Sequence, residues 1–264
     1  MACTSATEGL EVAELVFYGV AIIPAFFCFF THGKHGVAGW LYVILMCGLR
    51  LVGNGMAYHA LSTTGHPNEA AEIISGIGLS PILLAALGIL HEANHSIQTS
   101  LPSPLQGVSV ILPHAAILAG IALAAASKVK SSLLEAGMAV LTIGWLIIVA
   151  FVILSFLSPS QRMNGEKKLL IAVIIAVPLL GIRVIYSVVI AFVDGRAEGG
   201  SLAVQVIFGT VPEFLVMINY LSAGIMTKNM ARERQAELDA ETAEQRLNIS
   251  QKRPRESSCR SLSA

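Results

Sequence analysis

The chain has 264 residues, of which 55% are hydrophobic and 13% are charged, and its mean hydropathy is +0.71. An ordinary soluble domain carries about 25% charged residues, so this composition excludes that class and indicates a polytopic membrane protein. The formal net charge is zero. It gives no information about partners, because the charges are segregated by position.

Seven apolar runs are long enough for the roughly 20 residues that a helix needs to cross about 30 Å of hydrocarbon. The predicted fold class is therefore all-α, a polytopic membrane bundle of seven transmembrane helices. Residues 1–227 form the predicted transmembrane domain, with short loops between the spans. The predicted spans are residues 10–31, 37–59, 70–93, 108–127, 134–157, 169–193 and 202–226.

The start of the first run is acidic, with Glu8, Glu11 and Glu14, and no basic leader precedes it. The run is therefore predicted to be a retained helix and not a cleaved signal peptide. The Lys and Arg residues of the loops predict an extracytoplasmic or lumenal N-terminus and a cytoplasmic C-terminus. This orientation is supported by Lys34, Arg162, Lys167, Lys168, Lys228, Arg232 and Arg234, and opposed by Lys128, Lys130 and Arg196.

Residues 228–264 form a predicted cytoplasmic charged tail. The stretch 228–247 lacks Gly and Pro and is predicted to be helical, and the Ser-rich end beyond it is predicted to be disordered. The basic cluster 252–255 is interpreted as a topogenic or lipid-contacting segment in preference to a nucleic-acid-binding one. Glycosylation sequons begin at Asn94 and Asn248, so a sugar on either one would reverse this topology.

Two short motifs occur twice in the chain. Residues 48–52, GLRLV, reappear as GIRVI at 181–185, and GLSP at 78–81 reappears as GTVP at 209–212. This pattern indicates a three plus one plus three plan, in which two parallel three-helix repeats are joined by the span 108–127. The alternative is that short motifs recur by chance in an apolar chain rich in glycine.

Three charged residues lie deep inside the predicted spans. Arg50 lies about 20 Å along its helix from the cytoplasmic start, and Arg183 lies at the equivalent height of the second copy. Glu213 lies about 16 Å below the outer end of the last span. Isolated charges at this depth are expensive, so one network that faces the bundle interior is predicted.

Further polar residues share faces with these charges. Asn54 follows Arg50 by four residues, Asp194 follows Arg183 by eleven, and Tyr186 lies between Arg183 and Asp194. Pro212, directly before Glu213, and Pro81 in the other copy are expected to kink their helices.

Two interpretations of this cluster are open. In the functional one, it forms a polar site in an apolar chamber, where Glu213 holds a proton for transfer. The alternative is a structural ion pair that fixes helix register and binds no ligand. In the functional interpretation, the catalytic candidates are Glu213 and Asp194, and the substrate-binding candidates are Arg50, Arg183, Asn54 and Tyr186.

The segment from His91 to His95 matches the pattern H-E-x-x-H, in which two histidines one helical turn apart bind zinc and the glutamate activates water. A metalloprotease also needs a third ligand, and no later segment carries a recognisable second motif. The match lies at the cytoplasmic end of its span, where polar residues meet water. His91 and His95 are therefore weak metal candidates, and no metal or other cofactor is predicted.

The segments 39–53, 76–84, 183–186 and 212–213 resemble a family of uncharacterised fungal seven-helix integral membrane proteins. The resemblance covers residues 10–226. It implies a fungal polytopic membrane protein and implies no mechanism.

The first functional hypothesis is a membrane-bound enzyme of cyclase or isomerase type in fungal secondary metabolism. Glu213 would act as the acid or base, and Arg50 and Arg183 would bind an anionic or oxygenated group. The alternative is a small-molecule transporter or seven-helix receptor of the same architecture, and a minor alternative is a zinc-dependent membrane hydrolase. The expected partners are a lipophilic small molecule and the lipid bilayer, with no nucleic acid, and the oligomeric state stays open.

Overall fold

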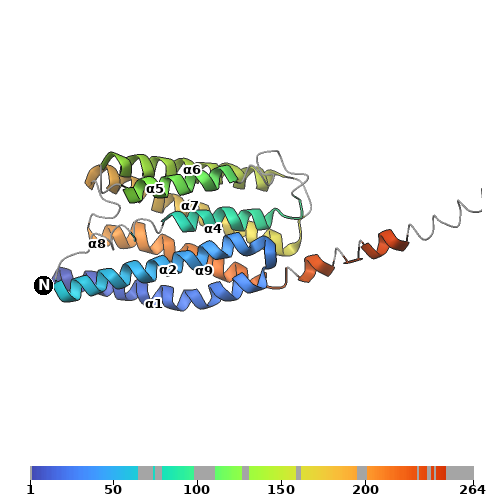
Figure 1. The fold of residues 1–264 in the computed structure, drawn as a ribbon, viewed down its shortest axis with the longest axis horizontal. Coiled ribbons are helices and arrows are strands. Elements are labelled where there is room, and N and C mark those ends of the chain that lie inside the picture. Colours follow the sequence, from blue (N-terminus) through green and yellow to red (C-terminus); the bar gives the residue numbers. More distant parts are fainter. Residues whose placement is uncertain are drawn as a thin grey trace, which may run out of the picture.

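The computed structural model describes residues 2–64, 74, 79–97, 111–126, 131–158, 162–194, 201–230, 232–236, 239–240 and 242–247. Every regular element in these ranges is a helix, which confirms the all-α fold class. The long helices lie side by side along one direction, and the charged tail leaves the bundle at one end (Figure 1). The elements are α1 (Ala2–Thr31), α2 (Gly33–Thr64), α4 (Leu79–Ala93), α5 (Ile111–Ala125), α6 (Ser131–Leu157), α7 (Asn164–Asp194), α8 (Leu202–Val204), the π-helix η5 (Gln205–Thr210) and α9 (Val211–Met226).

Five helical stretches in the described part of the chain are long and apolar enough to cross a membrane. They are Ala6–Thr31, Gly36–Thr63, Leu133–Leu157, Asn164–Val193 and Leu202–Met226. Together they fit an integral multi-pass membrane protein. The helices α4 and α5 have 15 residues each, about 22 Å at 1.5 Å per residue, which is less than the hydrocarbon thickness. The predicted spans 70–93 and 108–127 extend beyond the described residues on one or both sides, so the seven-helix plan stays a prediction.

The sharp turn between α1 and α2 has a clear local cause. Gly33 has a φ of 66°, a left-handed conformation that glycine adopts at little cost and that commonly ends a helix. The amide of His32 still donates to the carbonyl of Cys28 at 3.1 Å, which closes the last turn of α1. The chain then reverses at once, and α1 and α2 pack along each other as an antiparallel pair.

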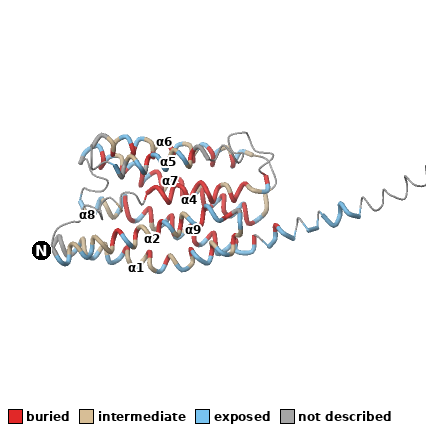
Figure 2. Tube along the Cα trace, in the orientation of Figure 1, coloured by how far each residue is buried: buried red, intermediate tan, exposed pale blue. Residues whose placement is uncertain are grey.

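The helix α4 lies at the centre of the bundle. Every residue from Leu79 to Leu90 is buried, which follows from its packing against α2, α5, α6 and α7. Figure 2 shows this helix buried along almost its whole length, whereas α1 and α6 alternate between buried and exposed turns. A helix that is apolar on all sides suits such a central position.

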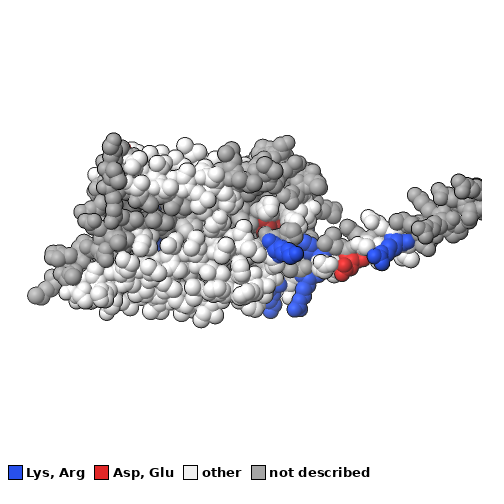
Figure 3. Space-filling model, in the orientation of Figure 1, with Lys and Arg blue, Asp and Glu red and all other residues white. Residues whose placement is uncertain are grey.

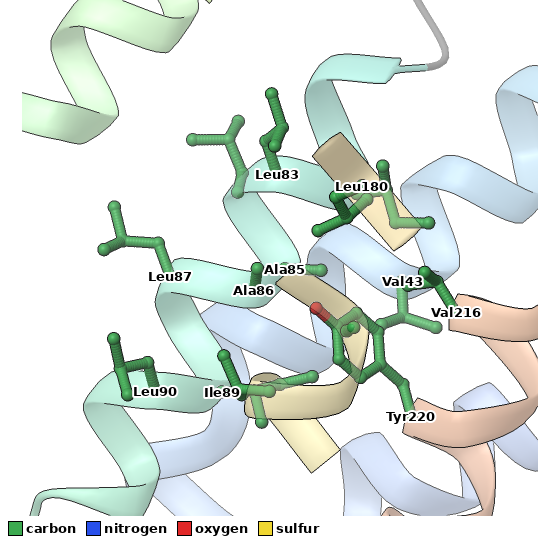
Figure 4. Packing of buried hydrophobic residues seen from close by; sticks show 14 of the residues in the cluster. Val43, Leu83, Ala85, Ala86, Leu87, Ile89, Leu90, Leu180, Val216 and Tyr220 are labelled. Carbon is green, nitrogen blue, oxygen red and sulfur yellow. The ribbon is translucent and has the colours of Figure 1, made fainter. Parts of the chain in front are cut away.

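The core packs closely because several helices meet at glycines. Gly39 of α2 and Gly88 of α4 face each other so closely that a Cβ on Gly88 would lie 2.5 Å from Cα of Gly39. In Figure 4, Tyr220 of α9 points toward Ala85 and Ala86 of α4, with Val43 of α2 beside its ring. Small residues on α4 therefore let large side chains from neighbouring helices fill the interior.

The outer surface of the bundle is apolar. Ile23, Phe30 and Val193 are 70%, 75% and 74% exposed, and the visible face over the helices is almost free of charge (Figure 3). A surface of this kind is stable only in contact with lipid or another apolar partner. The apolar helices thus indicate a lipid bilayer as the environment of the protein.

The helix neighbours repeat along the chain. In the first half α1 packs on α2 and α2 on α4, and in the second half α6 packs on α7 and α7 on α9. The two groups meet where α4 contacts α7 and where α1 contacts α9, while α5 packs chiefly on α6. This arrangement agrees with the order of helices in the three plus one plus three plan, and the internal repeat itself stays a prediction.

Candidate functional site

Charged side chains from four helical segments meet in the bundle interior. Glu14 comes from α1, Arg50 from α2, Arg183 from α7 and Glu213 from the first turn of α9. Their exposed fractions are 6%, 4%, 2% and 2%. Arg50 and Arg183 lie near the middle of helices of 32 and 31 residues, so the cluster lies far from both ends of the bundle.

Glu213 is the centre of this cluster. Arg50 binds it with two nitrogens, Nε at 2.7 Å from Oε1 and Nη2 at 2.5 Å from Oε2. Arg183 approaches from the other side, with Nε 3.4 Å from Oε2. The hydroxyl of Tyr18 donates a short hydrogen bond to Oε1. A two-nitrogen guanidinium contact of this geometry is among the strongest that a carboxylate can make.

Glu14 provides the second carboxylate. Its Oε2 lies 3.6 Å from Nη1 of Arg50 and accepts a hydrogen bond from Nδ2 of Asn54 at 2.8 Å. Its Oε1 accepts from the hydroxyl of Thr210 at 2.8 Å. Arg50 therefore lies between the two carboxylates and joins them into one network.

The surroundings of Arg183 complete the network on α7. Nη1 donates to the hydroxyl of Ser187 at 2.7 Å, one helical turn further along. The guanidinium also lies 5.4 Å from the ring centre of Tyr186, within the range of a cation–π contact. A Cβ on Gly209 would lie 3.3 Å from Cε1 of Tyr186, so this glycine leaves room for the ring beside the π-helix.

The network balances its own charge. It contains two guanidinium groups and two carboxylates, and among the described residues no side-chain nitrogen or oxygen of these four is buried without a hydrogen-bond partner. Burying an ion costs several kcal/mol, and close pairing with full hydrogen bonding offsets that cost. The arrangement is thus stable in an apolar bundle as long as all four groups stay in place.

The helix that carries Glu213 is irregular just before it. The segment Gln205–Thr210 is a π-helix, and Pro212 occupies the start of α9. π-Helical turns are rare in proteins. Where they do occur, they are frequently found at functional sites. This π-helical stretch ends two residues before Pro212, where a kink is predicted, and the kink itself stays a prediction.

The structure brings together most of the residues selected from the sequence. Arg50, Arg183 and Glu213 are in direct contact, Tyr186 packs on Arg183, and Asn54 joins through Glu14. Asp194 is the last residue of α7, eleven positions after Arg183, and its side chain is outside the described part of the structure. The catalytic and substrate-binding roles of all six stay predictions.

Four network residues were missed in the sequence. They are Glu14, Tyr18, Ser187 and Thr210. In the sequence, Glu14 is one of three acidic residues at the start of the first apolar run, and this position gives no indication of a buried role. The signal that was available is spacing: Tyr18 follows Glu14, and Ser187 follows Arg183, by four residues, which places each pair on one helix face.

The His91–His95 segment forms no metal cluster in the described residues, where no group of three or more His, Cys, Asp and Glu side chains is close enough to hold an ion. Glu92, the residue that would activate water, is fully buried and accepts a hydrogen bond from Nε1 of Trp40 at 3.1 Å. Glu92 therefore packs against α2 and does not face solvent.

A second polar cluster lies at the end of the bundle where the tail begins. The amide of Ser96 donates to Oε1 of Glu166 at 3.1 Å, and Nη2 of Arg234 lies 3.2 Å from the same oxygen. Nearby, Nη2 of Arg162 donates to the carbonyl of Ser155 at 2.5 Å and to Oδ1 of Asn94 at 3.2 Å. Arg234 and Arg162 each keep a buried Nε without a partner, so this cluster is less completely bonded than the interior network.

Taken together, the apolar helices and the buried arginine–glutamate pairs define an all-helical multi-pass membrane protein. The chain belongs to the family defined by the domain of unknown function DUF7702, whose model matches residues 4–230. No curated protein and no solved structure shows a significant match to it. The family assignment confirms the expected relation to a domain of unknown function, and a fungal origin stays a prediction.

Proposed function

We propose that the protein is a membrane carrier for a lipophilic small molecule with an anionic or oxygenated group, which Arg50 and Arg183 bind in place of Glu213. The observation that carries this proposal is the convergence of two arginines, from α2 and α7, on one carboxylate beside a π-helix. Guanidinium groups bind carboxylates and phosphates with matching geometry. The carboxylate of Glu213 thus occupies the position that the polar end of a bound solute would take.

The position of Glu213 supports an exchange of this kind. Its helix is interrupted by the π-helical stretch Gln205–Thr210 and by Pro212. Carriers commonly place solute sites at such broken helices near the middle of the membrane, and between two groups of helices that move against each other. A shift of α9 would withdraw Glu213 from the arginines and leave two cations for the solute.

The same geometry gives less support to acid–base catalysis by Glu213. Both of its oxygens accept hydrogen bonds from Arg50, so neither is directed toward a substrate. One observation favours the cyclase or isomerase hypothesis as a second candidate, namely the hydroxyl of Tyr18 on Oε1 of Glu213. A tyrosine and a glutamate that share a proton are a common acid–base pair.

The proposal is tested with three probes that share one isoprenoid chain and differ in the polar group: farnesyl phosphate, farnesoic acid and farnesol. Binding of each to the purified full-length protein is measured by thermal shift, and entry of labelled farnesyl phosphate is measured in proteoliposomes. We expect binding of the two anions and protein-dependent entry of the phosphate. R50Q and R183Q should each lower entry at least tenfold, because each removes a cation from the solute site.

The matched control is R246Q, the same substitution on an exposed tail residue, which should leave entry unchanged. Absence of both binding and entry for all three probes would contradict the carrier proposal for this chemical class. Chemical conversion of a probe without entry, lost in E213Q and Y18F, would support the enzyme in its place. Size-exclusion profiles of the variants show whether each is folded.

A further inference from the structure

His32 lies in the turn between α1 and α2, at the end of the bundle where the tail begins and away from the buried arginine–glutamate network. Its side chain is 1% exposed. Nδ1 lies 2.9 Å from the carbonyl of Cys28, and Nε2 lies 2.9 Å from the hydroxyl of Thr227, just after α9. The imidazole thus connects the α1–α2 turn to the point where the chain leaves the bundle for the tail.

The hydrogen bonds around His32 can be satisfied in two ways. The carbonyl of Cys28 only accepts, so Nδ1 carries a proton in both. The hydroxyl of Thr227 has a single proton and three neighbours, Nε2 of His32 at 2.9 Å and the carbonyls of Ala223 and Gly224 at 2.7 and 3.3 Å. If His32 is neutral, Thr227 donates to Nε2; if His32 is protonated, Nε2 donates to Thr227, and Thr227 donates to Ala223.

We propose that His32 is a proton-operated switch that controls how the start of the C-terminal tail is held on the bundle. Protonation reverses the hydrogen bond of Thr227 and adds a positive charge that repels Arg234, whose own charge disfavours the protonated imidazole. Arg234 is held by one hydrogen bond to Glu166, at 3.2 Å, and its Nε is buried without a partner. This repulsion therefore weakens the contact between Arg234 and Glu166, in which Arg234 is already incompletely bonded.

The other groups around His32 set the direction of its titration. Burial lowers the pKa of His32 below its ordinary value, the bond to Cys28 opposes this change, and the charge of Arg234 adds to it. Trp40 of α2 packs against the imidazole with ring centres 4.7 Å apart, and Trp40 in turn donates to Glu92 of α4. The carboxylate of Glu92 is the nearest acidic group in the described structure, because a Cβ on Gly36 would lie 2.7 Å from both its Oε2 and Cβ of His32. Other ionisable groups described at this end include the thiol of Cys28 on α1, Lys34 on α2, Glu166, Lys167 and Lys168 on α7, and Lys228 after α9.

The start of the C-terminal tail packs against the bundle. Met230 is 1% exposed and lies over Gly165, where a Cβ would come within 2.9 Å of its sulfur. Thr227 contacts His32 in the α1–α2 turn, and Met230 packs on α7. Arg234 bonds Glu166 of α7, which also accepts a hydrogen bond from the amide of Ser96 after α4. Loss of the Arg234 contact would free the tail beyond this point while the helices stay packed.

The test uses Trp40 as a reporter in the full-length protein. The chain has two tryptophans, so W145F leaves only Trp40, and a protonated imidazole in ring contact quenches indole emission. Emission is followed from about pH 8 to about pH 5, the interval in which histidine titrates. We expect a one-proton decrease with a midpoint below the ordinary value of about 6.5, absent in H32Q.

Arg234 provides a second variant in which His32 is intact. R234Q removes a positive charge that disfavours the imidazolium, so the midpoint should move to higher pH. R232Q, the same change on an exposed neighbour, should leave it in place. Hydrogen exchange of residues 227–236, corrected for intrinsic pH dependence, should increase below the midpoint in the parent protein and stay constant in H32Q.

A transition that persists in H32Q would overturn the proposal, as would a flat emission profile in W145F or an unmoved midpoint in R234Q. None of these measurements needs a transported solute. Failure of the carrier proposal and failure of the switch are therefore distinguishable. If both hold, the switch would make the position of the tail depend on the pH at this side of the membrane.

Discussion

Glu213 shows how a charged residue can lie in the middle of an apolar bundle. Its two oxygens accept hydrogen bonds from Arg50, a third contact comes from Arg183 and a fourth from Tyr18. Removing one member of such a network leaves an uncompensated buried charge, and this is why single substitutions in buried pairs are costly. The chemistry of the site is therefore tied to the stability of the fold.

Replacement of Tyr18 tests one contact without changing any charge. Y18F removes the hydroxyl that donates to Glu213 and keeps the ring, which packs edge-on against Phe17 and Phe214. A hydrogen bond to a charged group contributes about 1.5–3 kcal/mol, so the free energy of unfolding in detergent should fall by about that amount. Y58F, on a tyrosine that is 41% exposed, should leave it unchanged. Equal effects of the two substitutions would show that the Tyr18 hydroxyl has no special role.

Three of the four charges in the network could be predicted from the sequence, because each lies deep in an apolar run. The burial of Glu14 could not be predicted, because its helix begins well before the apolar run. The apolar run begins at about residue 10, but α1 begins at Ala2, so Glu14 lies more than three turns inside the helix. Helix starts depend on local capping and tertiary packing that an apolar run does not record.

At the scale of elements, the close approach of α2 and α4 depends on a pair of glycines. A Cβ on Gly88 would lie 2.5 Å from Cα and 2.6 Å from N of Gly39. Backbone atoms cannot move aside as a side chain does, so G88A must separate the two helices.

The cost of G88A should be that of an overpacked core, about 1–3 kcal/mol in the free energy of unfolding. The matched control is G48A on the same α2, because a Cβ there meets nothing within 4 Å. Chemical unfolding in detergent measures both. G48A should be neutral or slightly stabilising, since alanine is the better helix former. A stable G88A protein with an unchanged unfolding curve would be inconsistent with this helix contact.

The π-helix before α9 illustrates a limit of sequence-based prediction. Pro212 indicated an irregular helix, and the irregularity is present, but its form as six π-helical residues is not encoded by any one residue type. The hydroxyl of Thr210 binds Glu14 of α1, and Gly209 leaves room for Tyr186. The π-helix is thus stabilised by contacts with distant parts of the chain, which a local pattern cannot show.

At the scale of the whole molecule, several Lys and Arg residues gather at one end of the bundle (Figure 3). Lys34 is the second residue of α2, Lys167 and Lys168 lie at the start of α7, and Lys228 follows α9, all at the end where the tail leaves. Most of the Lys and Arg visible in Figure 3 gather there. By the positive-inside rule this end is proposed to be cytoplasmic, with the N-terminus on the other side.

Reporter fusions test this orientation. A green fluorescent protein after Ala264 should fluoresce in the cytoplasm, and a glycosylation sequon added before Met1 should acquire sugar. The native sequon at Asn94 is a poorer reporter, because its side chain is 4% exposed and binds Ser155 and Arg162. A glycosylated C-terminal sequon with an unmodified N-terminal one would reverse the proposed topology.

The central claim is that Arg50 and Glu213 form a buried pair within one network of balanced charge. A double-mutant cycle on the free energy of unfolding in detergent, with R50Q, E213Q and the double variant, tests it most directly. Each single variant leaves one uncompensated charge in the interior. Its free energy of unfolding should therefore fall by about 3–5 kcal/mol.

The double variant leaves Glu14 and Arg183, one charge of each sign. Its loss should therefore be smaller than the sum of the single losses by about 0.5–3 kcal/mol, the range found for residues in contact. R246Q serves as the control for the loss of an exposed arginine. Strictly additive losses, or single variants as stable as the parent protein, would contradict the network.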